Sequence, residues 1–437
     1  MKYLVIILSL ISFSAARSQT VYTLESFIAE MLQKDFGILL LKNEVQIAEY
    51  NNNPGNAGYL PTIGILADKN WSNNNTRQEF FSGQVNAAPS AKSTSTNAAV
   101  RLDWTFFDGF RMFATDKKLN VLEEISTLNL TAEMEMKIYQ ASVMFYTLIQ
   151  QEKRNDVYTQ ALDLSRARYD LAKIKLDLGA GTEIQMIQAR LDMTADSSAL
   201  LNNLKEIENL KADMNRFLAK DPAEQFTVQG EIMAVENISY ESSLSAAQQQ
   251  STNLLIAKAN IAVRDLERKE YQSFYYPQIG LYGQYAYASS ENQIGILNSN
   301  RAYGTGAGFT LRWNILDRMS NYTNIRNNKV QTESAEIYAA QEALTIRTEL
   351  RKTFNELEWA RRNLQLEQQN IMETESTFKI AQNAFENGSI TNLELREVQF
   401  SIVEAQNRYL QAQLTLKTAE LNVALTTGDF KKMLGNQ

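Results

Sequence analysis

The feature that most constrains the fold is an internal repeat. Residues 102–108, LDWTFFD, have a counterpart 209 residues later in residues 311–317, LRWNILD. The segment 178–182, LGAGT, returns at the same shift as NGSIT at 387–391. A shift that stays constant over about 80 residues indicates a duplicated structural plan. The chain is therefore expected to fold as two similar halves.

Each repeat begins with a segment that suits a helix, at about 23–53 and about 241–275. A proline follows each of them, Pro61 in the sequence YLPTIGI and Pro277 in the related sequence YYPQIGL. Proline lacks a backbone donor and disfavours the α region just before it. Each helix should therefore end before its proline, and an extended run should begin after it.

Alternating apolar and polar residues predict two strands in each repeat. The strands are expected at about 62–71, 96–107, 278–287 and 303–315, with the polar segments 72–93 and 288–301 as hairpin loops. Each run has about ten residues, which suits a tilted strand that crosses the hydrocarbon layer of a membrane. Four strands cannot close a barrel alone, so such strands would need partners from other chains.

Aromatic side chains stand near both ends of the predicted strands. The candidates for contact with a membrane interface are Trp71, Tyr285 and Tyr287 near the loops, and Trp104, Phe107 and Trp313 near the helices. Two aromatic levels on either side of an aliphatic band are typical of proteins in a bilayer. A sandwich with one buried face is the alternative interpretation of the same alternation.

A very long helix is predicted after the second strand of each repeat. Residues 109–177 and 318–386 contain no Pro and a single Gly. A helix of ~70 residues is about 105 Å long. In the second repeat, apolar residues recur every seven positions from Leu350 to Phe385, which predicts left-handed supercoiling of packed helices.

Each long helix is expected to turn back at a glycine. Gly179 and Gly388 can take the left-handed conformation that ends a helix. Thr182 and Thr391 stand three residues before Gln185 and Glu394, which is the pattern of a capping box. Return helices are therefore expected at about 183–220 and 392–427.

These elements predict the domain organisation. Residues 1–18 have the basic start, short apolar run and small-residue cleavage site of a secretory signal peptide. Residues 19–220 form the first repeat, and residues 241–437 form the second. The segment 221–240, which opens with Asp221-Pro222, is the linker between them.

Composition removes most classes of enzyme. The chain has no Cys and no His, so it lacks the thiolate nucleophile, the most common general base and the usual zinc ligands. No metal site and no cofactor are expected. The chain carries a net charge of −7, and loss of Lys2 and Arg17 with the signal would make it −9. An acidic exported chain is not expected to bind nucleic acid.

The repeated motifs together resemble those of the TolC-like outer-membrane efflux proteins. The resemblance rests on the two Tyr-x-Pro-x-Ile-Gly strand starts, the two Trp-containing strand ends and the two Gly-x-x-Thr turns, and it covers nearly the whole mature chain. It implies a homotrimer in the cell outer membrane. Each protomer would give four strands to a 12-stranded β-barrel in contact with outer-membrane lipid, and its helices would continue the barrel as a coiled-coil tunnel in the periplasm.

The resemblance further implies a passive exit duct of a tripartite efflux or type I secretion system. Its partners would be a periplasmic adaptor (membrane fusion) protein and an inner-membrane transporter. The docking tips would be Gly179, Ala180, Gly181 and Thr182 in the first repeat, and Gly388, Ser389, Ile390 and Thr391 in the second. Acidic residues that narrow the tunnel mouth in this family correspond to Glu394 and Glu397.

Two other interpretations compete with the duct. A periplasmic coiled-coil scaffold or adaptor without a channel would use the long helices, but it leaves the alternating strands and their aromatic ends without a role. A hydrolase that uses Glu394 and Glu397 as a carboxylate pair is the third. These residues are three apart on one helix, and no binding pocket is visible around them in the sequence.

Overall fold

The computed structural model describes residues 20–235 and 238–430. The expected signal peptide, residues 1–18, lies outside this part of the chain. The structure divides into two compact units, each of which draws on both repeats. The sheet unit consists of Leu41–Leu130 and Thr252–Leu344. The helical unit consists of the described residues that precede Leu41, that lie between Thr131 and Ser251, and that follow Leu344.

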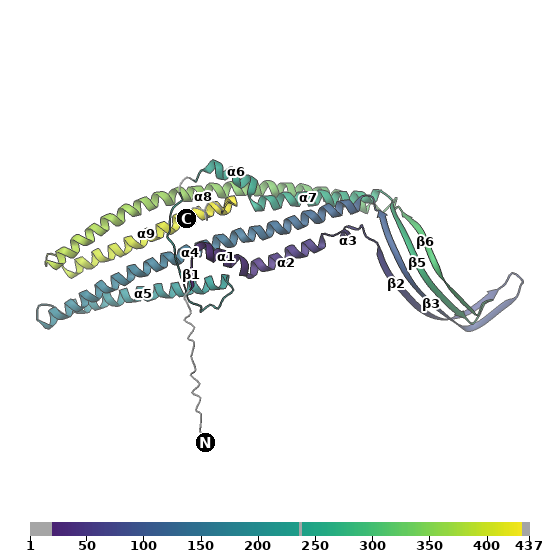
Figure 1. Cartoon of the computed structure of the whole chain (residues 1–437), viewed down its shortest axis with the longest axis horizontal. Coiled ribbons are helices and arrows are strands. Elements are labelled where there is room, and N and C mark those ends of the chain that lie inside the picture. Colours follow the sequence, from purple (N-terminus) through teal and green to yellow (C-terminus); the bar gives the residue numbers. More distant parts are fainter. Residues whose placement is uncertain (1–19, 236–237, 431–437) are drawn as a thin grey trace, which may run out of the picture. The chain divides into compact units, whose positions relative to one another are not determined.

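The sheet unit contains four antiparallel strands in the order β2-β3-β5-β6 (Figure 1). The strands are β2 (Thr62–Glu79), β3 (Val85–Phe107), β5 (Gln278–Asn292) and β6 (Ser299–Arg312). Each repeat supplies one hairpin, and the pairing of β3 with β5 joins the two hairpins into one sheet. The duplicated sequence therefore produces a duplicated half-sheet.

The first hairpin is longer than its sequence predicts. Most of the expected loop 72–93 continues the strands, with Ser72 opposite Ser93, and the strands end at a turn between Phe80 and Gln84 after one shift of register between Asn74 and Thr76. Polar Asn and Ser residues indicate contact with water, but they do not prevent backbone pairing with a neighbouring strand. In the second hairpin, β6 ends at Arg312, so that Trp313 lies just beyond the sheet.

The helices that lead into the sheet are broken rather than continuous. The expected helix at 23–53 consists of α1 (Leu24–Lys34) and α2 (Phe36–Asn51), followed by the short α3 (Pro54–Ala57). The expected helix at 241–275 consists of α6 (Tyr240–Gln250) and α7 (Thr252–Gln272), followed by the 3-10 turn η1 (Ser273–Tyr275). The breaks fall at Asp35 and Ser251, which are 216 residues apart, so the repeat includes them.

The turn from sheet to long helix has the same construction in both repeats. The long helices are α4 (Arg111–Asp177) and α8 (Ser320–Glu386), with 67 residues each. Asp108 accepts a hydrogen bond from the backbone N–H of Met112 at 3.0 Å, and Asp317 accepts one from Asn321 at 2.7 Å. These carboxylates satisfy free N–H groups at the helix start.

Two successive residues at each of these turns have left-handed backbone. They are Gly109 and Phe110 in the first repeat, and Arg318 and Met319 in the second, with φ between 58° and 75°. A Cβ atom at Gly109 would overlap the carbonyl oxygen of Ser273. The first repeat therefore requires glycine at this turn, whereas the second repeat holds the same conformation with an arginine.

The helical unit contains α4 from Thr131 onward and α8 from Thr345 onward. These parts pack with α1, α6 and the return helices α5 (Glu183–Phe217) and α9 (Asn392–Thr427). A two-stranded parallel ribbon of β1 (Thr20–Tyr22) and β4 (Phe226–Val228) joins the N-terminal segment to the linker. Leu350 and Leu357, two members of the seven-residue apolar row, are fully buried. Among the described residues, no helix is both long enough and apolar enough to cross a membrane.

Candidate functional site

The sheet exposes an apolar face that runs across all four strands. The register places Ile65 opposite Val100 and Val100 opposite Tyr285, and all three side chains are at least 48% exposed. The further exposed members of this face are Ile63, Trp104, Tyr287, Tyr303, Phe309 and Leu311. A continuous apolar surface of this kind marks a contact with lipid or with another protein.

The opposite face of the sheet is polar. Arg101 donates hydrogen bonds to Asp103 at 2.8 and 3.0 Å, and its guanidinium group lies over the ring of Tyr282. Gln284, opposite Arg101 in the register, belongs to the same face. The two faces of the sheet therefore present different environments, one apolar and one suited to water.

Five of the predicted interface aromatics lie on the apolar face, at different positions along the strands, and Trp313 lies just beyond the sheet. Trp71 pairs with Thr94 and Tyr287 with Ala98, so Trp71 stands four positions further from the helices than Tyr287. A β-bulge between Thr105 and Phe107 sets Phe107 opposite Ile279 on the same face. The aromatic residues near the loops therefore do not share one position along the strands.

The two tryptophans nearest the helices make equivalent hydrogen bonds. The indole Nε1 of Trp104 donates to the carbonyl oxygen of Tyr59 at 2.9 Å, and that of Trp313 donates to Tyr275 at 3.2 Å. Each bond ties the end of a hairpin to the segment that precedes its first strand. Trp104 and Trp313 remain 40% and 52% exposed, which suits an amphipathic residue at an interface.

The predicted tip turns have the same geometry in both repeats. The N–H of Ala180 bonds to Lys175 O at 2.8 Å, and the N–H of Ser389 bonds to Ala384 O at 2.8 Å. Gly179 and Gly388 are left-handed, with φ of 69° and 74°. These are Schellman turns, which satisfy the last carbonyl groups of α4 and α8.

Both tips carry apolar side chains that no neighbour covers within the chain. Leu178 and Ile184 flank the first turn and are 77% and 79% exposed, and Leu393 beside the second turn is 70% exposed. Gly179, Ala180, Thr182, Gly388, Ser389 and Thr391 are themselves exposed, and Gly181 and Ile390 are half-buried. The tips are therefore rigid turns with an apolar surface.

Glu394 and Glu397 lie in the first turns of α9 and are both exposed. The carboxylate of Glu394 accepts hydrogen bonds from the backbone N–H of Thr391 at 2.7 Å and from its hydroxyl at 2.9 Å. The hydrogen bond from the Thr391 backbone holds the pKa of Glu394 below its ordinary value of 4.5. Glu394 therefore remains charged at neutral pH and also caps its helix.

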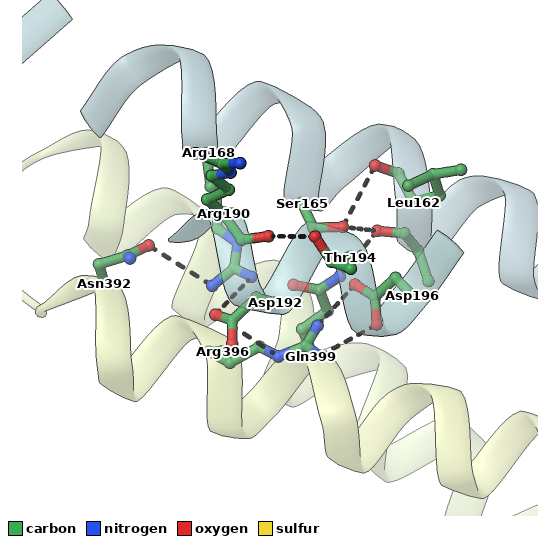
Figure 2. A network of polar contacts seen from close by, with 11 residues as sticks. Leu162, Ser165, Arg168, Arg190, Asp192, Thr194, Asp196, Asn392, Arg396 and Gln399 are labelled. Atoms are coloured by element: carbon green, nitrogen blue, oxygen red, sulfur yellow. Dashed lines mark hydrogen bonds and ion pairs between the residues drawn. The ribbon is translucent and has the colours of Figure 1, made fainter. Parts of the chain in front are cut away.

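Figure 2 shows a largely buried network of charges at the same part of α9, where Arg396 stands between Glu394 and Glu397 in the sequence. Arg396 lies between Asp196 at 2.7 Å and Asp192 at 3.7 Å, both on α5. Arg168 of α4, only 3% exposed, bonds to Asp192 at 3.3 Å and to Asn392 of α9 at 3.4 Å. The network joins three helices and both repeats, and its two positive and two negative charges balance.

The sequence does not point to this network. The positions equivalent to Arg168, Asp192, Asp196 and Arg396 at a shift of 209 residues are Thr377, Ser401, Ala405 and Ile187. Because none of these residues is charged, a comparison of the repeats gives no signal. Neighbouring Gln399, which donates to the carbonyl oxygen of Ala161 at 3.0 Å, was not predicted either. The described residues contain no cluster of acidic side chains that could hold a metal ion.

Comparison with known proteins agrees with this geometry. Residues 243–429, which make up most of the second repeat, match the family model "Outer membrane efflux protein". In its second repeat the chain is therefore similar to the outer membrane efflux proteins. This family is named for efflux at the outer membrane, which is the function and the location that the sequence of this chain predicts. No curated protein sequence matches the chain.

Solved structures share the fold over nearly the whole chain. The outer-membrane channel OprN is 15% identical, with 93% of this chain and 90% of that chain covered and a TM-score of 0.76. The CmeC outer membrane channel of Campylobacter jejuni is 14% identical, with 93% and 85% covered and a TM-score of 0.77. The outer membrane protein VceC of Vibrio cholerae is 13% identical, with 93% and 96% covered and a TM-score of 0.74. These matches confirm the predicted fold class of four long strands with long coiled helices.

Proposed function

We propose that three copies of this chain assemble into a passive exit duct. Each copy would give four strands to a 12-stranded barrel in the outer membrane, and its long helices would form a tunnel in the periplasm. The duct would serve a tripartite efflux or type I secretion system, with the energy supplied by an inner-membrane transporter.

The observation that carries this proposal is the sheet itself. Its apolar face is exposed across four strands, its opposite face is polar, and the outer edges of β2 and β6 have no strand partner among the described residues. An unpaired edge next to hydrocarbon leaves N–H and C=O groups without partners, which costs several kcal/mol for each group. Pairing of β6 with β2 of a neighbouring copy removes both edges and separates the lipid face from a watery interior.

The tips support docking onto a periplasmic adaptor protein. In each tip a rigid Schellman turn presents exposed apolar side chains, led by Leu178 and Leu393. An exposed apolar side chain on a rigid turn loses little conformational entropy when a partner covers it. The residues 179–182 and 388–391 would form the centre of this contact.

The narrow mouth of the duct would be formed by Glu394 and Glu397. Three copies would gather six carboxylates at the start of α9. Carboxylates of like charge in a narrow opening attract cations and repel one another. The buried network around Arg396 would hold α9 against α4 and α5, and it would thereby fix the positions of these carboxylates.

The test is the conductance of the detergent-purified protein in planar bilayers, with the oligomeric mass measured on the same sample. We expect a trimer whose channels are small and prefer cations. A monomer without conductance would contradict the duct and favour a periplasmic coiled-coil scaffold. A conducting trimer that lacks cation preference would keep the duct and remove Glu394 and Glu397 from its mouth.

A further inference from the structure

The apolar face of the sheet does not end where the strands end. The ring of Phe107, which the β-bulge sets on the apolar face, makes an edge contact with Phe110 at 5.3 Å. Phe110 in turn contacts Tyr276 at 6.0 Å and Phe113 at 6.3 Å. These four rings, here called the junction aromatics, continue the apolar face onto the first turn of α4 and onto the end of η1.

A cleft of about 550 Å³ opens beside the junction aromatics. Its walls come from the start of α4, the end of α7 and η1, and they include Phe110, Phe113 and Tyr276. At its base, Gly109 lies so close to the carbonyl oxygen of Ser273 that a Cβ atom would not fit between them. Its volume lies within the range of small-molecule sites.

Two lysines, Lys117 of α4 and Lys269 of α7, line the same cleft. Both are exposed, and neither has an ion pair or hydrogen bond with any residue that the structure describes. Their sequence neighbours behave differently, because Lys118 and Glu270 form an ion pair of 2.6 Å with each other. The cleft therefore has an aromatic wall, two free cations and a nearby acid that is already neutralised.

We propose that this cleft binds the phosphate group of a glycerophospholipid from the leaflet next to the helices. This inference rests on the proposed position of the sheet in the membrane. In a bilayer the phosphate layer lies just outside the hydrocarbon, beside the level at which aromatic side chains gather. The protein has the same sequence of layers. The strands come first, the junction aromatics follow them, and Lys117 and Lys269 lie beyond the aromatics. The amphipathic rings would contact the glycerol and the first acyl carbons.

The cleft lies next to the two central strands of the sheet, so it would stay open in the proposed trimer. Its residues follow β3 and precede β5, the two central strands of the order β2-β3-β5-β6. A neighbouring copy would pair at the edges, β2 and β6, and would not cover the centre of the sheet. Anionic lipid is favoured over zwitterionic lipid because the two lysines have no protein counter-ion.

The test measures lipid retained by the whole protein. The protein is purified in a neutral detergent, incubated with phosphatidylglycerol and analysed by native mass spectrometry. The variant Lys117→Gln with Lys269→Gln is compared with Lys258→Gln with Lys329→Gln, which removes two exposed lysines of the same unit from outside the cleft. We expect the first variant to bind the lipid about tenfold more weakly than the wild type, and the second to bind like the wild type.

Three results would overturn the inference. The first is equal retention by the two double variants. The second is displacement of the lipid by millimolar inorganic phosphate, which would indicate a site for free anions. The third is equal retention of phosphatidylglycerol and of uncharged diacylglycerol, which would remove the phosphate from the contact. Bilayer conductance of the same samples separates this inference from the proposed function, because a conducting protein without lipid preference contradicts only the lipid site.

Discussion

Arg396 of α9 donates two hydrogen bonds to Asp196 of α5, with N–O distances of 2.7 and 2.9 Å. The two residues are 200 positions apart and belong to different repeats. A two-point contact between guanidinium and carboxylate fixes orientation as well as distance. The contact holds the start of α9 against α5, the return helix of the first repeat. Because α9 also carries Glu394 and Glu397, the contact also fixes the positions of these two residues.

Replacement of Arg396 by Leu should loosen the tip. The change leaves Asp192 and Asp196 facing each other with only Arg168 to balance them. We expect the free energy of unfolding to fall by about 2 kcal/mol. This is less than the roughly 3–5 kcal/mol lost when a fully buried ion pair is broken, because Arg396 and Asp196 both keep some exposure. Hydrogen exchange of the α9 backbone should become faster.

The matched control is Arg408→Leu on the same helix. Arg408 contacts Glu367 and Glu404 at 3.3 and 3.4 Å, but its side chain is 46% exposed. Exposed ion pairs contribute about 0–1 kcal/mol, so this variant should change little. Equal effects of the two substitutions would argue against a special role of the buried network.

Gly388→Ala and Gly109→Ala should differ strongly although both sites are left-handed. No atom lies within 4 Å of a Cβ placed at Gly388, so only the backbone cost of about 1–2 kcal/mol applies. A Cβ at Gly109 also meets Ser273 O and lies 2.9 Å from the Cβ of Tyr276, so the start of α4 must move. The midpoint of thermal unfolding should fall several times further for Gly109→Ala, and similar shifts would contradict the close approach.

Cation preference should depend on pH through Glu394. In the single chain, the hydrogen bond from the Thr391 backbone holds the pKa of Glu394 below 4.5, so its charge is lost only as pH falls below that value. Close packing of carboxylates at the mouth would raise the pKa of Glu394 and move the loss of its charge to higher pH. The ratio of cation to anion conductance, measured from pH 7 to pH 3, distinguishes the two cases. In the double variant Glu394→Gln with Glu397→Gln, this ratio should not depend on pH.

The N-terminal segment should make stability sensitive to acid. Burial raises the pKa of Glu30, but hydrogen bonds from Lys34, Tyr22 and Lys220 outweigh it and lower the pKa to about 2. A carboxylate whose pKa is lowered by folding stabilises the fold fully at pH values above its pKa in the unfolded chain, which is 4.5. That stability should be lost progressively as pH falls from about 4.5 towards 2.

Unfolding in denaturant at pH 6 and pH 3 measures this effect. The difference in unfolding free energy between the two pH values should be smaller for Glu30→Gln than for the wild type. Glu25→Gln, at the start of the same helix α1, is a suitable control because Glu25 is exposed. A pH dependence that Glu30→Gln leaves unchanged would assign the effect to other carboxylates.

The sequence predicts those features that the duplication repeats. Strand starts at Thr62 and Gln278, turns at Gly179 and Gly388, and caps at Thr182 and Thr391 follow from proline, glycine and hydroxyl chemistry that acts within a few residues. Local rules of this kind need no knowledge of distant contacts. For that reason the order of the elements and the fold class are accessible from the sequence alone.

The sequence does not predict contacts that connect the two repeats. The pairing of Arg396 with Asp196 depends on how α5 and α9 pack, and neither position is charged in its counterpart. The cleft at Lys117 and Lys269 depends on the approach of α4 to η1. The extent of β2 and β3 is also missed, because polar composition reports on solvent and not on pairing.

The two hairpins of the sheet differ in length. The last pair between β3 and β5 joins Ser93 to Asn292, whereas β2 and β3 continue as a ribbon of two strands to the turn at Gly83. Nothing lies within 4 Å of a Cβ at Gly83, so added residues at this turn would displace no neighbour. A short epitope inserted there would therefore act as a reporter of orientation, accessible to antibody on intact cells only if this end of the sheet faces outward.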